Sequence, residues 1–505
     1  MSSKLNIFSG LNNFAGYLRR RLLLDLPQAR GLAFLLWDRR WFIVSMSLGA
    51  ILLQLPPPEG LSQAGYIVLT MSIMSVILFV TEPIPLPTVA LLIIVGQVVL
   101  LGLDSSVVAK SIMSDSVLFI MGSLMLAVAI VRQKLDKRIA YQIVRFTGTK
   151  TINLSIGISF VSGVLASVIG EHTVAAMMLP VAITLITLTS EDPKQVRKLA
   201  TVLLFSISYG CAIASIGTPS GGARNAIMIG FWQEFFYDPL NPDTYKYLID
   251  YVKWVAYAYP IFLIQLPFVS FILLTTVKPE YSHVTRAVVK LRAQLAEEGP
   301  MQASHWGTIL IFLCTLIAWV GYSDVLGLGI IAIIGAVAFL VFGLVQWEDI
   351  NSNVNWGVVL LYGAAISLGV QMKETGAALW IADHFLATLQ PMGADSGVPL
   401  WIGMSALTTA VTNTMSNGAA VAVLGPITLN LATAAGESPI LMGFITSISS
   451  AFAYLTVIGT PAMTIVYASG YLKPSDFMKV GIRMVIMSTT VLIFAAYFYW
   501  PLIGL

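Results

Sequence analysis

The sequence predicts an all-α protein that crosses a membrane many times, and its composition and charge pattern support this prediction. Of its 505 residues, 57% are apolar and 10% are charged, and the mean hydropathy is +0.84. An ordinary soluble domain carries about 25% charged residues. Here 34 of the 53 charged residues lie in five short stretches: 1–40, 131–150, 191–198, 233–253 and 278–298. Long apolar runs separate these stretches, which is typical of a polytopic membrane protein and excludes a water-soluble one.

Residues 1–40 form a basic N-terminal segment. Six arginines between positions 19 and 40 precede the first long apolar run, and no small-residue cleavage site follows that run. We therefore expect the segment to be retained and to lie on the cytoplasmic side of the plasma (inner) membrane. The net charge of +3, without a basic tract interleaved with aromatic residues, gives no indication of a nucleic-acid partner.

Two membrane halves follow, residues 41–277 and 304–505, and a polar linker at 278–303 separates them. Several apolar segments within these halves are too long or too interrupted for a single helix. Irregular backbone persists at membrane depth only where protein or a water-filled cavity surrounds it, so the interrupted segments are the candidates for a site. The expected membrane segments are 41–55, 64–80, 86–103, 112–131, 151–190, 199–230, 254–277, 305–322, 326–345, 354–372, 398–437, 440–470 and 482–503. Hydropathy does not distinguish hairpins from spans, which leaves the number of crossings open.

The two halves contain an internal repeat. Four pairs of segments match in the same order, with offsets of 241, 242, 246 and 242 residues. The last pair contains Gly-Thr-Pro twice, and proline removes a backbone donor and restricts the residue before it, so both copies are expected to interrupt a helix. Paired interruptions of this kind indicate the binding site of a secondary transporter. The matched segments are 118–122 with 359–363, 139–140 with 381–382, 170–172 with 416–418, and 216–219 with 458–461.

The interrupted segments carry residues suited to binding ions. Unpaired N–H groups at the start of a half-helix favour an anion, whereas freed carbonyls and side-chain oxygens favour Na⁺. Residues 412–418 hold five neutral oxygen-bearing side chains within an apolar run. Such a cluster is costly in a membrane unless its members bind something or hydrogen-bond to each other, and both alternatives stay open.

Three ionisable residues stand out in the first half. Glu171 and His172 lie inside an apolar segment, where an ionisable group is by default a functional hypothesis. They do not form HExxH, so an intramembrane metalloprotease has no support. Arg224, if buried, needs an anionic partner, which is either Glu171 or the substrate.

Several sequence motifs are similar to those of a known protein family. Residues 81–87 (TEPIPLP) look like the family stretch "TEAIPLP", and Ser416-Asn417 begins a second "SNT" motif. Residues 175–180 are similar to the family sequence immediately after its first SNT, and the Gly-Thr-Pro sequences at 217–219 and 459–461 look like paired "TPPN" turns. Over residues 64–500 the chain resembles the divalent anion:sodium symporter family, whose members transport dicarboxylates, citrate or sulfate.

The resemblance implies a homodimer of two inverted repeats, with re-entrant helix hairpins, broken transmembrane helices and a transport part that moves across the membrane like an elevator. It would put the hairpins near 112–132 and 354–373. It also implies a small anionic substrate, Na⁺ as the coupling ion and no organic cofactor. Carried over residue by residue, the substrate would contact Gly170, Glu171, His172, Thr218, Pro219, Ser416, Asn417, Gly418, Thr460 and Pro461. One sodium ion would be held by Glu171 and Gly217, and the other by Thr412, Asn417, Gly459 and Pro461.

The chain also departs from the family pattern. The first SNT reads Gly-Glu-His at 170–172, the second ends in Gly418, and the first TPPN turn is expanded through Arg224. We therefore hypothesise that Arg224 either replaces one sodium ion or binds the substrate, with Glu171 orienting it. A second hypothesis is that Glu171 and His172 titrate and make transport depend on pH.

The sequence thus predicts a secondary active transporter of small, dicarboxylate-like anions that is driven by sodium through the second site. A sodium-independent anion exchanger, or a sulfate or other oxyanion transporter with Arg224 in place of a cation, is the main alternative. A membrane receptor or channel is the alternative outside transport. An enzyme has least support, since no nucleophile with a base and no metal-ligand spacing is present in the sequence.

Overall fold

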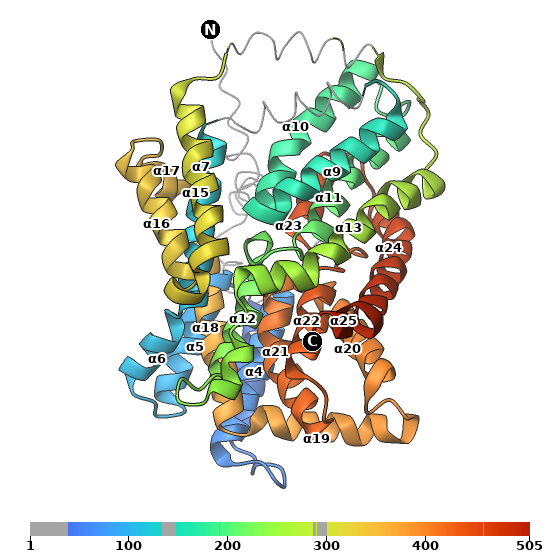
Figure 1. Ribbon diagram of the computed structural model, residues 1–505. Coiled ribbons are helices and arrows are strands. Elements are labelled where there is room, and N and C mark those ends of the chain that lie inside the picture. The colour runs from blue at the N-terminus through green and yellow to red at the C-terminus, as the bar shows by residue number, and fades with distance from the viewer. Residues whose placement is uncertain (1–38, 134–147, 191, 286–288, 290–299, 458) are drawn as a thin grey trace, which may run out of the picture.

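The computed structural model describes residues 39–505 except 134–147, 191, 286–288, 290–299 and 458 (Figure 1). Helices make up its regular secondary structure, and one isolated bridge joins Lys150 and His283. The predicted basic segment up to residue 38, half of the predicted linker and residues 139–140 of the repeat lie outside the described residues. The first half contains α3 (Arg40–Leu52), α4 (Gln63–Thr81), α5 (Leu86–Val99), α6 (Ser105–Ile112), α7 (Asp115–Arg132), α9 (Thr151–Ile169), α10 (Glu171–Thr189), α11 (Arg197–Ala214), α12 (Ala223–Phe236) and α13 (Tyr251–Thr276).

The second half repeats this order of helices. It contains α15 (Ala303–Leu326), α16 (Leu328–Val341), α17 (Trp347–Asn353), α18 (Trp356–Glu374), α19 (Ala377–Leu389), α20 (Gly397–Thr412), α21 (Asn417–Ala434), α22 (Pro439–Ser449), α23 (Pro461–Tyr467), α24 (Pro474–Phe494) and α25 (Trp500–Leu502). Helices α5 and α16 both have 14 residues, and α10 and α21 have 19 and 18. This order supports the internal repeat, while the inversion of one half relative to the other stays a prediction.

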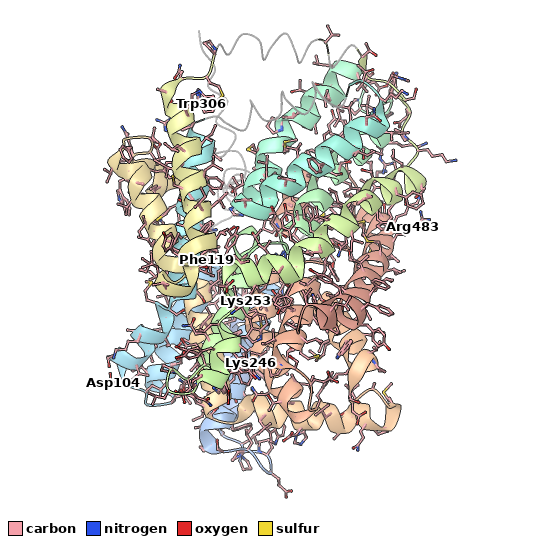
Figure 2. The ribbon with its side chains drawn as sticks, viewed as in Figure 1. Asp104, Phe119, Lys246, Lys253, Trp306 and Arg483 are labelled. Atoms are coloured by element: carbon pink, nitrogen blue, oxygen red, sulfur yellow. The ribbon has the colours of Figure 1, made fainter. Side chains whose placement is uncertain are left out.

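Within the described residues, nine helices are long and apolar enough to cross a membrane, and the bent pair α6–α7 would make a tenth. The prediction of a polytopic, all-helical membrane protein is confirmed. Charged side chains such as Asp104 and Arg483 lie at the periphery, whereas Phe119 is buried in the interior (Figure 2). Lys246 and Trp306 lie toward opposite ends of the molecule in the same view. Which end is cytoplasmic stays a prediction.

The motif at 81–87 forms the break between α4 and α5. Helix α4 ends at Thr81, and Glu82 adopts a left-handed conformation with φ of 41°. Pro83 and Pro85 cannot donate to a helix ladder, and the fixed φ of proline suits the residues just before and at a helix start. Helix α5 accordingly begins at Leu86.

The hairpins predicted near 112–132 and 354–373 are wrong. Helix α7 runs without a break from Asp115, just after its bend from α6, and α18 runs without a break from Trp356, so neither helix turns back on itself. Their glycines serve packing rather than turns: a Cβ on Gly122 would lie 2.5 Å from the Cβ of Ala332, and one on Gly363 would lie 2.5 Å from the Ile112 carbonyl oxygen. Because neither helix contains a proline or a residue with positive φ, nothing ends the helix inside them.

Two other helix pairs meet at polar tips, α9–α10 at Gly170 and α20–α21 at residues 413–416. Gly170 has a φ of 87°, a conformation that side chains with a Cβ rarely adopt, and it separates α9 from α10 without any intervening loop. Figure 1 shows α9 and α10 in the upper part of the molecule and α20 and α21 in the lower part. The two pairs therefore approach each other from opposite ends.

The predicted interruptions at the Gly-Thr-Pro sequences are present. Helix α11 ends at Ala214 and α12 begins at Ala223, while α22 ends at Ser449 and α23 begins at Pro461. Helix α11 is buried along most of its length and packs closely on α9, where Ser155 and Ser206 hydroxyls lie 2.7 Å apart. Small residues permit this approach.

We expect Gly210→Ala to destabilise the protein by about 1–3 kcal/mol, because a Cβ there would lie 2.6 Å from the Ser159 carbonyl oxygen of α9 and overpack the interface. The measurement is thermal unfolding in detergent. Gly403→Ala in α20 is the matched control, since no atom lies within 4 Å of its added Cβ. The control should be neutral or slightly stabilising, and equal effects of the two substitutions would contradict the prediction.

Candidate functional site

The two tips and the two interrupted helices meet around one cavity with a volume of about 250 Å³. It lies between elements of both halves, which the matched offsets alone could not establish. Its wall combines the tip and break residues with side chains of α7 and α18. The lining residues are Phe119, Ile120, Ser123, Leu124, Ile169, Gly170, Glu171, His172, Pro219, Ser220, Gly221, Gly222, Ala223, Arg224, Asn355, Val358, Tyr362, Ser416, Asn417, Gly418 and Pro461.

Four helices present their first turns to this cavity: α10, α12, α18 and α21. Backbone donors are available at two of these starts, α10 and α21, whereas the Val358 N–H of α18 bonds to Asn355 and the Asn225 N–H of α12 bonds to the Gly222 carbonyl oxygen. Across the described part of the chain, the N–H groups of Glu171, His172, Asn417 and Gly418 donate no hydrogen bond to the protein. Free N–H groups at a helix start carry partial positive charge, so their convergence favours an anion.

A buried ion pair lies at the first tip. Arg224 Nη1 is 4.0 Å from Glu171 Oε1, and the two side chains are 2% and 8% exposed. Arg224 Nη2 also donates to the Ser215 hydroxyl, which lies 3.3 Å from Glu171 Oε2. Arg224 Nε is buried without a hydrogen-bond partner among the described residues. Of the two anionic partners that the sequence left open for Arg224, Glu171 is the one in place, and the Nε–H of the guanidinium remains unused.

Glu171 also joins the two tips directly. Asn417 Nδ2 donates to Glu171 Oε1 over 3.3 Å, linking matched positions of the two halves. On its other side, Asn417 Oδ1 lies 2.9 Å from the Thr412 hydroxyl, which is 2.7 Å from the Ser450 carbonyl oxygen. Three neutral oxygens of different chemical kinds thus cluster behind the second tip.

The two Thr-Pro turns have nearly the same local structure. Thr218 has φ and ψ of −137° and 158°, and Thr460 has −131° and 153°. Each threonine hydroxyl accepts a hydrogen bond from a backbone N–H three residues later, over 3.0 and 3.2 Å. Both side chains are buried, and the hydroxyls act as helix caps.

The first turn is expanded, yet in both turns a side chain bonds to the backbone carbonyl oxygens that the helix break leaves free. Asn225 Nδ2 donates to the carbonyl oxygens of Ser215 and Thr218, both over 2.8 Å. In the second turn the Thr464 hydroxyl contacts the carbonyl oxygens of Val457 and Thr460, at 2.9 and 3.3 Å. The extra residues form a short 3₁₀ turn, Pro219–Gly221, and bring Arg224 beside Glu171.

Most of the predicted substrate residues line the cavity. The exceptions are Thr218 and Thr460, which are not part of its wall because their hydroxyls are turned inward to cap the following turns. Of the predicted sodium ligands, Glu171, Asn417 and Pro461 line the cavity, and Gly217, Thr412 and Gly459 lie behind it. The predicted substrate residues found in the wall are Gly170, Glu171, His172, Pro219, Arg224, Ser416, Asn417, Gly418 and Pro461.

Sequence reasoning missed the wall contributed by α7 and α18. Tyr362 and Phe119 both belong to the matched segments 118–122 and 359–363, so the repeat had already pointed to these positions. Asn355 caps α18, its side chain accepting from the Val358 N–H, and it too faces the cavity. The signal that could have identified Tyr362 was its position, as a polar aromatic residue, within one of the segments that match between the two halves.

The fold and the cavity define a membrane transport protein. Residues 36–505 match the family model described as the sodium:sulfate symporter transmembrane region. The chain belongs to this family, the divalent anion:sodium symporters, and is a transporter rather than an enzyme.

Several relatives are similar over nearly the whole chain. The sodium-dependent high-affinity dicarboxylate transporter 3 of Caenorhabditis elegans is 27% identical over 482 residues, covering 84% of this chain and 82% of the relative. The sodium-dependent dicarboxylate transporter SdcS of Staphylococcus saprophyticus is 24% identical, covering 91% of each chain. An uncharacterised transporter of Haemophilus influenzae is 28% identical, covering 91% of this chain and 96% of the relative.

Two solved transporter structures share the fold. The YdaH transporter of Alcanivorax borkumensis has a TM-score of 0.52 at 14% identity, covering 77% of this chain and 85% of its own. MtrF of Neisseria gonorrhoeae also has a TM-score of 0.52, at 12% identity, covering 79% of this chain and 84% of its own. At these identities the likeness concerns architecture alone.

We expect Glu171→Gln to destabilise the protein by about 3 kcal/mol, because it leaves the buried Arg224 without its counter-charge. Thermal unfolding in detergent measures the effect. Arg132→Gln is the control: it removes an ion pair with Asp349 of 3.0 Å whose arginine is 57% exposed, and such a surface pair contributes at most about 1 kcal/mol. If both variants unfold at the same temperature, the pair at the tip is not a buried ion pair of the kind described.

Proposed function

We propose that this protein is a secondary active transporter of small anions, of the di- or tricarboxylate kind, coupled to sodium. The observation that carries the proposal is the convergence of four helix starts and one buried arginine on a single cavity between the two halves. Oriented N–H donors with a guanidinium favour an anion, and the low dielectric of the membrane strengthens the attraction. Relatives that are named as sodium-dependent dicarboxylate transporters support the same substrate class.

The cavity suits an anion with two charged ends. The start of α10, with Arg224 beside it, forms one pole, and the start of α21 forms the other. A dicarboxylate spanning the cavity would use free donors at both poles. The unused Nε–H of Arg224 supplies a charge-assisted donor for the first carboxylate or for an oxyanion such as sulfate.

Sodium binds behind the second tip in this proposal. The Asn417 amide oxygen and the Ser450 carbonyl oxygen both lie within 3 Å of the Thr412 hydroxyl oxygen. Three neutral oxygen ligands gathered at a broken membrane helix suit Na⁺. Thr412 is fully buried, so an ion there is shielded from water. Gly459 and Pro461 from the second turn complete the predicted ligand set.

At the first tip, Arg224 takes the place of a sodium ion. Its guanidinium already balances the Glu171 carboxylate, and a sodium ion at the same point would bring a second positive charge beside a buried one. Coupling then depends on one cation site instead of two. The same observation favours the alternative function, a sodium-independent anion exchanger.

The remaining mechanism follows the family. We infer a homodimer in which the transport part, carrying both tips, moves the bound anion across the membrane against a fixed scaffold. His172 lines the cavity and is exposed there, and no described side chain hydrogen-bonds to its imidazole. Its titration during the cycle stays a prediction.

Uptake of labelled succinate, malate, citrate and sulfate into proteoliposomes, with and without a sodium gradient, tests this function. We expect sodium-stimulated uptake of at least one dicarboxylate, together with counterflow, because a carrier exchanges labelled for unlabelled substrate across the membrane. Uptake that requires an anion inside the vesicles and does not depend on sodium would indicate anion exchange instead of sodium symport. No uptake and no counterflow of any of these anions would contradict the proposal.

Thr412→Val should raise the sodium concentration for half-maximal uptake at least about 10-fold, because it removes one hydroxyl ligand while keeping the side-chain volume. Thr408→Val is a close control, since this residue lies one turn earlier on α20, is equally buried, and has a hydroxyl without a partner in the described structure. The control should keep the wild-type sodium dependence. Equal sodium dependence of both variants would remove the second tip as the coupling site.

A further inference from the structure

The second tip carries a glycine at position 418, and a tyrosine from another helix fills the space beside it. Gly418 is the second residue of α21, where the motif that this segment resembles carries threonine. A Cβ at this position would overlap the Tyr362 ring and its hydroxyl oxygen. The Tyr362 side chain therefore rests directly on the first turn of α21.

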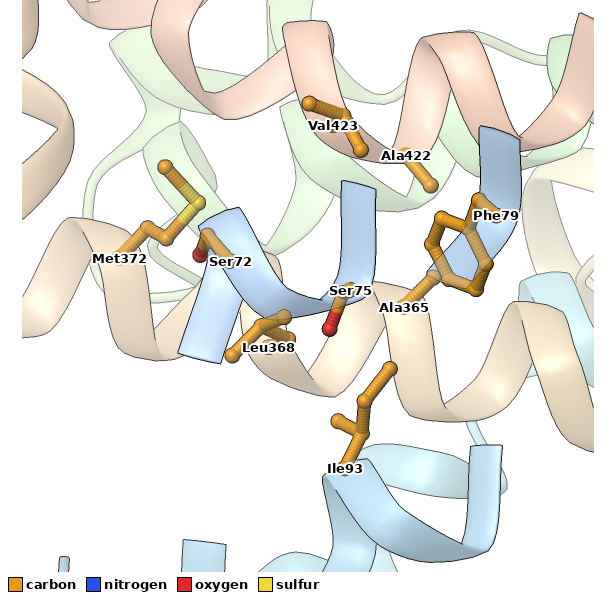
Figure 3. Close-up of a pocket in the computed structure, with 9 residues that line it drawn as sticks. All are labelled: Ser72, Ser75, Phe79, Ile93, Ala365, Leu368, Met372, Ala422 and Val423. Carbon is orange, nitrogen blue, oxygen red and sulfur yellow. The ribbon is translucent and has the colours of Figure 1, made fainter. Parts of the chain in front are cut away.

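The packing of α18 against α21 fixes the position of Tyr362. Two close contacts join these helices, Tyr362 with Gly418 and Gly369 with Pro426, and they lie two helical turns apart. Ala365 and Ala422 line the same small apolar void of about 10 Å³, which Figure 3 shows with the neighbouring side chains. A Cβ on Gly369 would lie 2.9 Å from Pro426 Cγ. The small residues hold the helices together, so the aromatic ring at the end of the series has little freedom.

The Tyr362 hydroxyl is free to bind a ligand. Tyr362 is half-buried and lines the cavity together with Arg224 and Asn417. Within the described residues, its phenol has no hydrogen-bond partner, although a tyrosine hydroxyl in such surroundings usually has one. The neighbouring Arg224 Nε is a second unpartnered donor, on a side chain that is 2% exposed.

We propose that Tyr362 determines substrate specificity by donating its phenol hydrogen to the carboxylate held at the start of α21. It replaces the hydroxyl that a threonine at position 418 would supply, but from α18 and not from the tip itself. The aromatic ring also fills the cavity over Gly418, which limits the length of anion that fits between the two poles. This inference rests on the proposed anion transport and adds the residue that recognises the second charged end.

Tyr362→Phe tests the hydroxyl and keeps the ring. We expect KM for dicarboxylates to rise about 10-fold or more, with the maximal rate little changed, because a hydrogen bond to a charged group is lost. Anion-induced stabilisation in thermal unfolding should weaken in parallel. Tyr209→Phe is the control, since that hydroxyl is buried, has no partner among the described residues and does not line the cavity.

Two substitutions that move the side chain from position 362 back to position 418 test whether Tyr362 takes the place of a threonine at 418. Gly418→Thr alone should abolish transport because its side chain overlaps Tyr362, and Tyr362→Ala combined with Gly418→Thr should restore transport with a KM lower than that of Tyr362→Ala. A double variant no better than Gly418→Thr would overturn the proposed exchange of positions.

The outcomes separate the two levels of proposal. Wild-type protein that is neither stabilised by nor transports any of the four anions would refute the proposed function and this inference with it. Wild-type protein that transports a dicarboxylate, with a KM unchanged in Tyr362→Phe, would refute the role of Tyr362 alone.

Discussion

The structure depends on the need to satisfy backbone groups where helices are interrupted inside a membrane. Lipid offers no hydrogen bonds, so a break is tolerated only where protein or a water-filled cavity surrounds it. The breaks after α9, α11, α20 and α22 meet within one region of the molecule. The Thr218 and Thr460 hydroxyls cap two of the new helix starts, and Asn225 and Thr464 bond the carbonyls freed before them. The N–H groups that remain unpaired face the cavity, and in the proposed function they bind the anion.

The two halves use the same scaffold for different electrostatics. At the second tip, neutral oxygens of Thr412, Asn417 and Ser450 gather without a formal charge. At the first tip, Glu171 and Arg224 bring one charge of each sign. The hydrogen bond from Asn417 to Glu171 connects the two environments, so a change at one tip is felt at the other. A near-symmetric backbone thus supports a site with two unlike poles.

The sequence was informative where a local signal marks a local structure. Gly-Thr-Pro repeated in register predicted both helix interruptions, because proline removes a backbone donor and restricts the residue before it. Glu171, His172 and Arg224 were identified because an ionisable group in an apolar membrane segment is costly and therefore indicates a function. Hydropathy could not identify the helix pairs that meet at tips, since α7 and α18 are as apolar as any hairpin arm, and their glycines turned out to admit close neighbours. Tyr362 escaped notice because its contact with Gly418 depends on how two helices pack, which no single segment encodes.

The pairing of Arg224 with Glu171 has a consequence for how the membrane potential acts on the carrier. A bound sodium ion crosses and is released, whereas a guanidinium crosses with the protein and returns with it. On the proposed mechanism, the first tip is electrically neutral in both directions, and a doubly charged anion crosses with the compensation of one mobile cation. One uncompensated elementary charge corresponds to about 2.3 kcal/mol per 100 mV, so an inside-negative potential opposes entry of the loaded carrier and assists its exit. A single side chain thereby sets the direction in which voltage drives the cycle.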